Sequence, residues 1–422
     1  MRSITANRGM SRRHFLEHLA GGSALAAPAL ALVQSLRTHA AQLRREQKAC
    51  ILLWMGGGPP TIDLWDLKPG TSTGGPSRPI STAGEGQISS LLPRLAEQMG
   101  RLSIVRSMST READHTRGAY YMHTGYVPNP NVEHPGYGSV VASQLGGTAN
   151  GLEIPPFVAI GGGSVGPGFL GRAYAPFEVD AQGNVAHLAA RVDATRMTER
   201  MRLLGILEER FIRENRGAAA AEHAKVLERT RTLMSSDQMR AFRTDQEPAA
   251  VRARYGATGF GRGCLMARRL VETGVPFVEV NFGGWDLHQN CFEQLEAKAP
   301  ELDQSMSALV DDLAARGLLE RTVVLWMGEF GRTPRINENA GRDHWARSWS
   351  VVLGGGSLQG GRVVGATNED GTAVTTEPYS SEDLMATVCQ ALGISLATVF
   401  TSGNGRPMKI AGGGKAIAGL LD

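Results

Sequence analysis

The sequence predicts an α/β fold with three layers, in which helices cover both faces of a mostly parallel central sheet. Three observations support this prediction. Short apolar segments alternate along the chain with longer segments of helical periodicity. Glycine-rich turns follow several of the apolar segments, and the chain contains 53 glycines. Hydrophobic residues make up 42% of the chain and charged residues 20%, a composition that supports a packed core.

The short apolar segments are predicted to be buried strands, because most of them end at glycine or a turn. They cover residues 49–55, 102–108, 156–160, 275–282, 322–327 and 349–353. Segments 261–273 and 291–315 have the apolar periodicity of helices, and a glycine closes each of them. Segment 380–392 is predicted to be a terminal helix with a serine N-cap and with Glu382 and Asp383 in its first turn.

The first 40 residues are predicted to be a twin-arginine signal peptide. Residues 11–16 supply the arginine pair and Phe-Leu, an alanine-rich stretch covers 19–36, and small-residue cleavage sites end at Ala31 or Ala40. A basic amphipathic helix is the alternative. Export by the twin-arginine machinery would make the protein periplasmic or secreted. No apolar run reaches the ~20 residues that a membrane span needs, so we expect no stable span after the leader is removed.

The basic charge of the chain comes partly from this leader. Cleavage after Ala40 would remove a net charge of +4 and change the whole chain's +3 to −1. We therefore expect no nucleic-acid partner. The mature domain is predicted to span 46–422, with a helical insert over about 185–250 that is rich in Ala, Glu, Arg and Leu. The insert could be a cap over the site or an interaction surface.

Residues of the kind that bind metals follow several predicted strands. The carboxyl ends of parallel strands meet at one edge of a sheet, where ligands bind. The predicted metal ligands are Asp63, Asp286, His288, Glu329, Asp343 and His344. Asp286 and His288 are two residues apart, so an extended backbone points both to the same side. Of the last two candidates, Asp343 and His344, one could bind the metal while the other orients it.

Each of these assignments has an alternative. Asp63 could cap a turn or helix, and Asp66 competes with it as a ligand. Glu329 follows the most apolar strand, where a carboxylate must be paired, protonated or metal-bound, and Arg332 could be its partner in a buried ion pair. Asp286 and its neighbouring histidine could be ordinary surface residues. The four cysteines form no CxxC pair, which disfavours a thiolate zinc site.

Residues 115–118 open a predicted helix whose N-terminus could face an anion. His115 or Thr116 could act as a nucleophile, with Arg117 binding the oxyanion. Arg332 could also stabilise negative charge that develops during a reaction. His115 could instead be one more metal ligand.

Six short motifs occur in the loops of the predicted domain. They are Gly56-Gly57-Gly58-Pro59, Ile62-Asp63 with Asp66 and Lys68-Pro69, Arg117 to Gly125, Gly284-Trp285-Asp286 with His288, Met327 to Pro334, and Gly341 to Trp345. Together they resemble a large family of twin-arginine-exported bacterial proteins known only as a domain of unknown function. That family is related to the alkaline phosphatase and sulfatase superfamily, and the resemblance runs from about residue 49 to the C-terminus.

The resemblance implies an alkaline-phosphatase-like α/β/α sandwich and metal-assisted hydrolysis of phosphate or sulfate esters. By position, Asp63 resembles the first-strand metal aspartate and His344 the late metal histidine. Thr124-Gly125 resembles the end of the nucleophile helix of sulfatases, which places the nucleophile near His115. The chain departs from relatives in lacking a Cys-x-Pro-x-Arg signature, which excludes formylglycine chemistry, and in having Phe330 where relatives carry a metal histidine.

These expectations favour an exported metal-dependent hydrolase of sulfate or phosphate esters. The substrate would be an anionic ester, either a small molecule or a polysaccharide. Mixed Asp, Glu and His ligands suit Zn²⁺ or Mn²⁺, with Ca²⁺ and Mg²⁺ as alternatives. A non-catalytic protein that binds anions or polysaccharide on a hydrolase-like fold is the rival hypothesis, because a fold does not determine a function. A metal-dependent isomerase or mutase is a third.

Overall fold

The structure is a computed structural model, and it describes residues 47–421 except 147–150, 185–191, 214–231 and 235. The predicted signal peptide and its cleavage sites therefore lie outside the described residues. Among the residues that are described, no helix is both long enough and apolar enough to cross a membrane.

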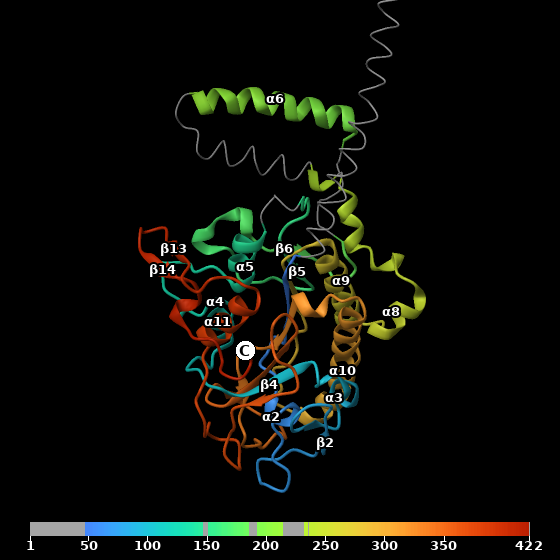
Figure 1. Cartoon of the computed structure of the whole chain (residues 1–422), viewed down its shortest axis with the longest axis vertical. Helices are drawn as coiled ribbons and strands as arrows, with labels where there is room; N and C mark the ends of the chain where they lie inside the picture. The colour runs from blue at the N-terminus through green and yellow to red at the C-terminus, as the bar shows by residue number, and fades with distance from the viewer. Residues whose placement is uncertain (1–46, 147–150, 185–191, 214–231, 235, 422) are drawn as a thin grey trace, which may run out of the picture.

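An eight-stranded sheet forms the centre of the molecule (Figure 1), with the strand order β12-β4-β11-β8-β1-β7-β5-β6. Its strands are β1 (Ala49–Trp54), β4 (Leu102–Met108), β5 (Phe157–Ile160), β6 (Phe177–Val179), β7 (Phe277–Asn281), β8 (Thr322–Met327), β11 (Trp349–Gly354) and β12 (Val363–Val364). Seven of these strands run in one direction, and β11 is antiparallel to both of its neighbours. The prediction of a mostly parallel sheet is confirmed.

The direction of β11 follows from its connection to β8. A parallel neighbour needs a crossover of a dozen or more residues, usually through a helix. Residues 328–348, all of them described, form only two short strands and no helix between β8 and β11. The chain therefore returns directly from the carboxyl end of β8, and the strand that it forms next to β8 is antiparallel.

Helices cover both faces of the sheet, as Figure 1 shows. One face carries α3 (Pro93–Gln98), α8 (Ala249–Tyr255), α9 (Gly259–Thr273) and α10 (Cys291–Ala315), and the other carries α4 (His115–Thr124), α5 (Tyr137–Leu145) and α11 (Ser381–Ala391). Alternate residues of β1 supply the two cores: Ile51 packs with α9 and α10, whereas Leu52 packs with α5 and α11. The three-layer prediction is confirmed, and burial on both faces explains why this strand is apolar throughout.

The remaining elements are short. The small strands are β2 (Pro79–Ser81) with β3 (Gln87–Ser89), β9 (Gly331–Arg332) with β10 (His344–Trp345), and β13 (Val399–Thr401) with β14 (Pro407–Lys409). The short helices are α2 (Thr61–Leu64), η2 (Gly168–Leu170), η3 (Arg172–Tyr174), η4 (Asp237–Phe242), η5 (Thr244–Gln246), η6 (Leu319–Arg321) and η7 (Ile410–Gly413).

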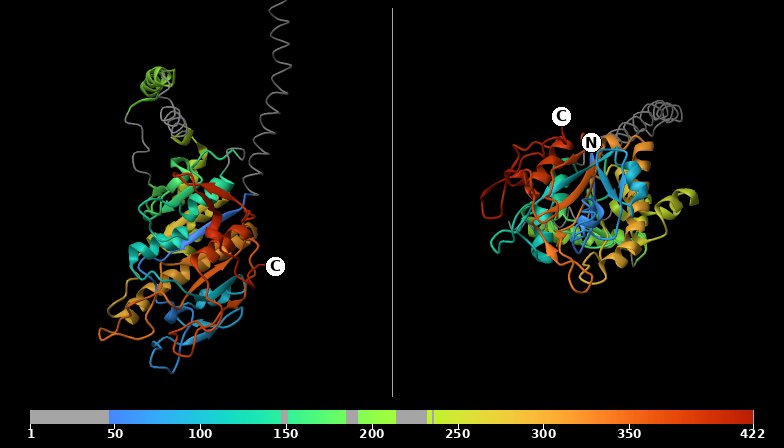
Figure 2. Two further views of the ribbon diagram at one scale, coloured as in Figure 1. Left: turned by 90° about the vertical axis from the view of Figure 1, so that its left-hand side faces the viewer. Right: turned by 90° about the horizontal axis from the view of Figure 1, so that it is seen from below.

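The predicted helical insert is described only in part. It contains α6 (Ala194–Arg213), which lies beyond the layered body in Figure 1 and in the left view of Figure 2. Residues 237–246 were predicted to continue this helical pattern but form the 3₁₀ helices η4 and η5 instead. Phe242 of η4 is buried in the core beside α9, so a tertiary contact holds this segment close to the body.

Candidate metal centre

Glycine loops at the carboxyl ends of β1 and β7 bring two distant segments together. Gly57 has a φ of +111°, and a Cβ atom there would lie 2.5 Å from the backbone nitrogen of Asp286. The backbone N–H of Trp285 donates to the carbonyl of Gly56 over 3.1 Å. Only glycine allows this close approach, and it places Asp286 in front of the sheet.

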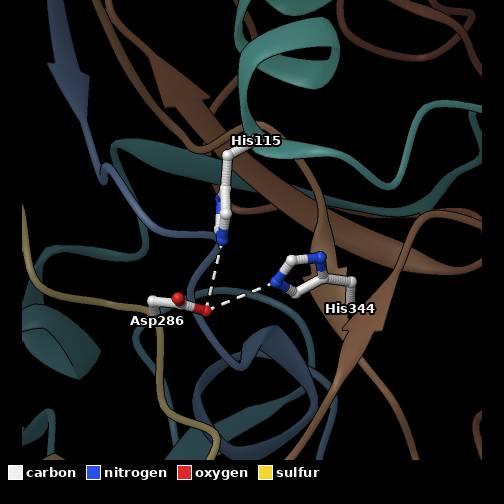
Figure 3. A group of neighbouring side chains, drawn as sticks. All are labelled: His115, Asp286 and His344. Carbon is white, nitrogen blue, oxygen red and sulfur yellow. Dashed lines mark hydrogen bonds and ion pairs between the residues drawn. The ribbon is translucent and has the colours of Figure 1, made fainter.

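Asp286 lies at the centre of a group of side chains that could hold a metal ion (Figure 3). His115 comes from the start of α4 and His344 from β10, and the ligand atoms of the three residues all lie within 4.8 Å of one another. Oδ1 of Asp286 is 3.3 Å from Nε2 of His115 and 3.4 Å from Nε2 of His344. His288 adds a third imidazole, whose Nε2 is 2.9 Å from the same oxygen.

Each of the three imidazoles has a hydrogen-bond acceptor beside its other nitrogen. The pairs are His115 Nδ1 with Glu329 Oε1 at 2.7 Å, His288 Nδ1 with Asp343 Oδ1 at 3.0 Å, and His344 Nδ1 with the Ala113 carbonyl at 2.7 Å. A neutral imidazole with an acceptor at Nδ1 carries its proton there, so its Nε2 presents a lone pair. This pattern, in which an outer acceptor orients each ring, is typical of histidines that bind metals.

The spacing of these lone pairs suits a bound cation. Nε2 of His288 and Nε2 of His344 are only 3.1 Å apart. Two lone pairs that face each other repel unless a proton or a metal ion lies between them. In a tetrahedral site with metal–nitrogen bonds of 2.0–2.1 Å, neighbouring ligand atoms lie about 3.3 Å apart. Burial also lowers the pKa of His344, which favours the neutral form that can bind a metal.

Arg332 is wholly buried behind Asp286, and its five N–H groups all have partners. They are directed at the carbonyls of Gly57, Gly58 and Arg342, at Oδ1 of Asp286 (2.5 Å) and at Nε2 of His288 (3.3 Å). Burial raises the pKa of Asp286, but the hydrogen bond and charge of Arg332 outweigh it and lower that pKa to about 2. The N–H groups of Arg332 are thus all directed at groups of the protein, and its carboxylate partner is Asp286, not Glu329.

Glu329 and Asp343 support the histidines from outside. Glu329 is 3% exposed, and its Oε1 accepts hydrogen bonds from His115 and from the backbone N–H of Gly57. Its Oε2 is buried and has no hydrogen-bond partner among the described residues. The hydrogen bond from His288, together with one from Asn337, lowers the pKa of Asp343. Both carboxylates accept hydrogen bonds from imidazoles; the sequence predicted Glu329 as a ligand and left open whether Asp343 binds the metal or orients a neighbour.

Residues 47–421 match a family described as "Protein of unknown function (DUF1501)". The chain belongs to this family. No protein with a curated function matches it.

Several solved structures resemble this DUF1501 protein. The lipoteichoic acid synthase LtaP from Listeria monocytogenes is 9% identical, with 89% of this chain and 76% of that chain covered and a TM-score of 0.40. The sulfatase PsFucS1 from Pseudoalteromonas sp. is 12% identical, with coverages of 86% and 70% and a TM-score of 0.40. A protein in the alkaline phosphatase superfamily from Vibrio parahaemolyticus is 13% identical, with coverages of 89% and 71% and a TM-score of 0.36.

Asp63, the first predicted ligand of this DUF1501 protein, lies in a different setting. Its two carboxylate oxygens accept hydrogen bonds from Nε and one NH₂ group of Arg342, over 2.7 and 2.8 Å. Arg342 also donates to the carbonyl of Thr73, and neither member of the pair is more than 1% exposed. The structure therefore places Asp63 in a buried ion pair and does not bring it into the group around Asp286.

Two further predicted catalytic residues follow His115 at the start of α4. Thr116 is exposed. Arg117 is exposed as well, and its guanidinium forms two hydrogen bonds with Glu112, over 2.7 and 2.9 Å. The N-cap of the helix is Asp114, which accepts the backbone N–H of Arg117. Of the four predicted catalytic residues, His115 supplies a ligand atom to the group around Asp286, and Arg332 bonds Asp286 itself.

Sequence reasoning missed two features next to this region. Arg342 precedes the predicted Asp343-His344 pair, and its place in that motif was the available signal. The second feature is the buried pair of His123 and Glu279, whose Nε2 and Oε1 are 3.2 Å apart. Burial lowers the pKa of His123, but the charge of Glu279 outweighs it and raises that pKa overall. A histidine near the end of a mixed helix carries no sequence signal for a partner on a distant strand.

Proposed function

We propose that this protein is a metal-dependent hydrolase of phosphate or sulfate esters. The observation that supports the proposal is the convergence of three imidazole Nε2 atoms on Oδ1 of Asp286, each with its Nδ1 next to an acceptor. This donor set suits Zn²⁺ or Mn²⁺ better than Ca²⁺ or Mg²⁺, which prefer oxygen ligands.

Asp286, His288 and His344 would hold the metal ion, and the bond at Nε2 of His288 would replace the 3.3 Å contact of that nitrogen with an N–H group of Arg332. When bound, such an ion polarises the ester oxygen and stabilises negative charge in the transition state. Arg332 neutralises Asp286 from behind and keeps its carboxylate ionised. Asp343 holds the ring of His288, so the nitrogen that faces the ion does not need to reorient.

His115 would be the attacking group. Its Nε2 faces the centre and makes no hydrogen bond among the described residues, while Glu329 holds its Nδ1. The lone pair of Nε2 would form a bond to the phosphorus or sulfur atom as the bond from that atom to the ester oxygen breaks, and the alkoxide would take its proton from solvent water. Water would then cleave the new bond and release the inorganic anion. Glu329 would compensate the positive charge that the imidazole acquires in between.

Elemental analysis tests the metal. The chain without residues 1–40 is purified without chelator and compared with an Asp286→Asn/His344→Ala variant and with a matched Asp237→Asn control on the exposed surface of η4. We expect close to one metal ion per chain in the parent and the control and almost none in the double variant. Metal-free parent protein would refute the proposal.

A screen with aryl phosphates and aryl sulfates tests the chemistry. We expect turnover by the metal-loaded parent, and a His115→Gln variant that retains metal but loses turnover. Metal without turnover of any ester would instead favour a non-catalytic anion-binding protein. One observation supports that rival: both arginines predicted to bind an oxyanion are occupied by carboxylates of the protein itself.

Export is part of the same proposal. The arginine pair and the alanine-rich stretch before residue 41 support a twin-arginine leader and a periplasmic or secreted location. Cell fractionation with an Arg12→Lys/Arg13→Lys variant tests it, and we expect this variant to remain in the cytoplasm. An unchanged distribution would refute twin-arginine export.

A further inference from the structure

A second site lies away from the metal centre. A cavity of about 630 Å³ opens between the end of α8, the start of α9 and the turn that follows β6. Its polar lining includes Arg243, Arg252, Arg262, Asp245, Gln182 and Asn184. A volume of this size is typical of small-molecule sites and exceeds what a single inorganic anion requires.

The cavity carries an excess of positive charge. Arg243 is paired with Asp245, which leaves two arginines without a carboxylate partner among the described residues. Arg252 donates to the backbone carbonyl of Asp245 over 3.3 Å, and Arg262 donates to the carbonyl of Ala257 over 2.5 Å. Both guanidinium groups have further N–H donors from which an anionic ligand can accept hydrogen bonds.

The rest of the lining mixes polar and apolar groups. Gln182 has an amide that can donate and accept hydrogen bonds, and the amide of Asn184 already donates to Asp180. Tyr255 and Leu265 are the two large apolar side chains in the lining. A sugar that carries a sulfate or phosphate group matches both the amides and the unpaired guanidinium groups.

The cavity and the metal centre lie at the same edge of the sheet. Gln182 follows β6 and Asp286 follows β7, and both strands run parallel to β5, which lies between them. Neighbouring strands are about 4.8 Å apart, so β6 and β7 are separated by about 10 Å. The start of α9 is also at this edge, because Phe260 stacks on Phe282 with ring centroids 4.5 Å apart. The two sites share no residue.

We propose that this cavity, which we call the arginine cavity, binds a second anionic group of an extended sulfated or phosphorylated saccharide. The ester to be cleaved would occupy the metal centre. The part of this inference that concerns cleavage rests on the proposed hydrolase function, whereas binding in the arginine cavity does not require a metal.

Calorimetric titration of metal-free protein with a short dextran sulfate tests the arginine cavity. The test variant is Arg252→Gln/Arg262→Gln, and the matched control is Arg202→Gln/Arg362→Gln, which removes the same charge from exposed surface ion pairs. Hydrogen bonds to charged groups imply that the test variant binds roughly 10- to 100-fold more weakly. The control should change affinity by about twofold or less.

Two outcomes would overturn the inference: test-variant affinity equal to the parent's, or an equal loss in the control. If the test variant does not fold, as judged by thermal unfolding, the single change Arg252→Gln at an exposed position replaces it. The Asp286→Asn/His344→Ala variant separates the two proposals, because it should bind dextran sulfate like the parent. Loss of binding in that variant would place the anion at the metal centre and refute a separate site.

Discussion

Two aspartate–arginine pairs lie near the carboxyl ends of β1 and β7, and they differ in how far the aspartate is exposed. Asp63 and Arg342 are both buried, and both carboxylate oxygens bond to the one guanidinium. Arg332 is equally buried, but the side chain of its partner Asp286 is 46% exposed, and the oxygen that it bonds also faces three imidazoles. The first carboxylate is fully occupied within the protein, whereas the second can take another ligand.

The difference shows that residue type and loop position do not identify a metal ligand. Asp63 and Asp286 both follow a glycine-rich turn near the end of a central strand. What separates them is which oxygens the protein engages: both oxygens of Asp63 accept from Arg342, whereas Arg332 bonds one oxygen of the half-exposed Asp286. Removal of one partner from such a buried carboxylate–arginine pair leaves an uncompensated buried charge.

The largest expected effect is on folding stability. The Asp63→Ala variant leaves Arg342 buried without its counter-charge, so we expect the free energy of unfolding to fall by about 3–5 kcal/mol. Urea unfolding measures the loss. The matched variant Asp286→Asn keeps an acceptor for Arg332, which also bonds backbone carbonyls, and should lose only about 1 kcal/mol. Equal losses of unfolding free energy in the two variants would show that the two aspartate–arginine pairs do not differ in their effect on stability.

The next effect concerns the residue behind His115. In Glu329→Gln the ring of His115 loses its charged acceptor, so we expect ester turnover to fall by about 10- to 100-fold, as for other residues that orient a metal site. The metal content should be unchanged, since Glu329 contacts Nδ1 and not the central Nε2 group. Steady-state kinetics together with elemental analysis measure both quantities. Loss of metal from this variant would show that Glu329 is a ligand.

A smaller effect is expected when acid protonates Glu247, a partly buried carboxylate beside Arg268 and Arg269. Burial raises the pKa of Glu247, but hydrogen bonds from Arg268 and Arg269 outweigh it and lower that pKa overall. The Glu247 carboxylate therefore takes up a proton more readily in the unfolded chain than in the folded protein. Ionised Glu247 stabilises the folded protein fully above the ordinary carboxyl pKa of about 4.3. This stabilisation is lost as the pH falls through the lower pKa that Glu247 has in the folded protein. Urea unfolding at a series of acidic pH values measures the slope. Glu247→Gln should flatten it, and an unchanged slope in that variant would contradict the assignment.

The smallest effect is expected at the start of α4. Arg117 is exposed and paired with Glu112, so Arg117→Gln should alter ester turnover by about twofold or less. Ester turnover by Arg117→Gln is measured beside that of His115→Gln, whose substitution lies in the same helical turn. A tenfold loss in Arg117→Gln would restore its predicted role in binding an oxyanion.

Local patterns were sufficient for most of the fold. The strand Thr322–Met327 and the helix Cys291–Ala315 have the bounds that the sequence predicted, because a continuous apolar run and a sustained apolar periodicity each end at a clear boundary. The strands Phe177–Val179 and Val363–Val364 were not predicted. They are three and two residues long, too short for any periodicity, and pairing with a neighbouring strand is what makes them strands.

The same distinction between local patterns and distant contacts applies to the residues of the site. The sequence by itself determined that Asp286, His288 and His344 follow strands or glycine-rich turns at one edge of a parallel sheet, since strand order and turn chemistry are local properties. Only the tertiary structure decided which carboxylates remain open to a ligand. Asp63 and Arg342 are 279 positions apart, and no local pattern encodes such a pair. A metal ligand is defined by which partners a side chain lacks, and those partners come from distant parts of the chain.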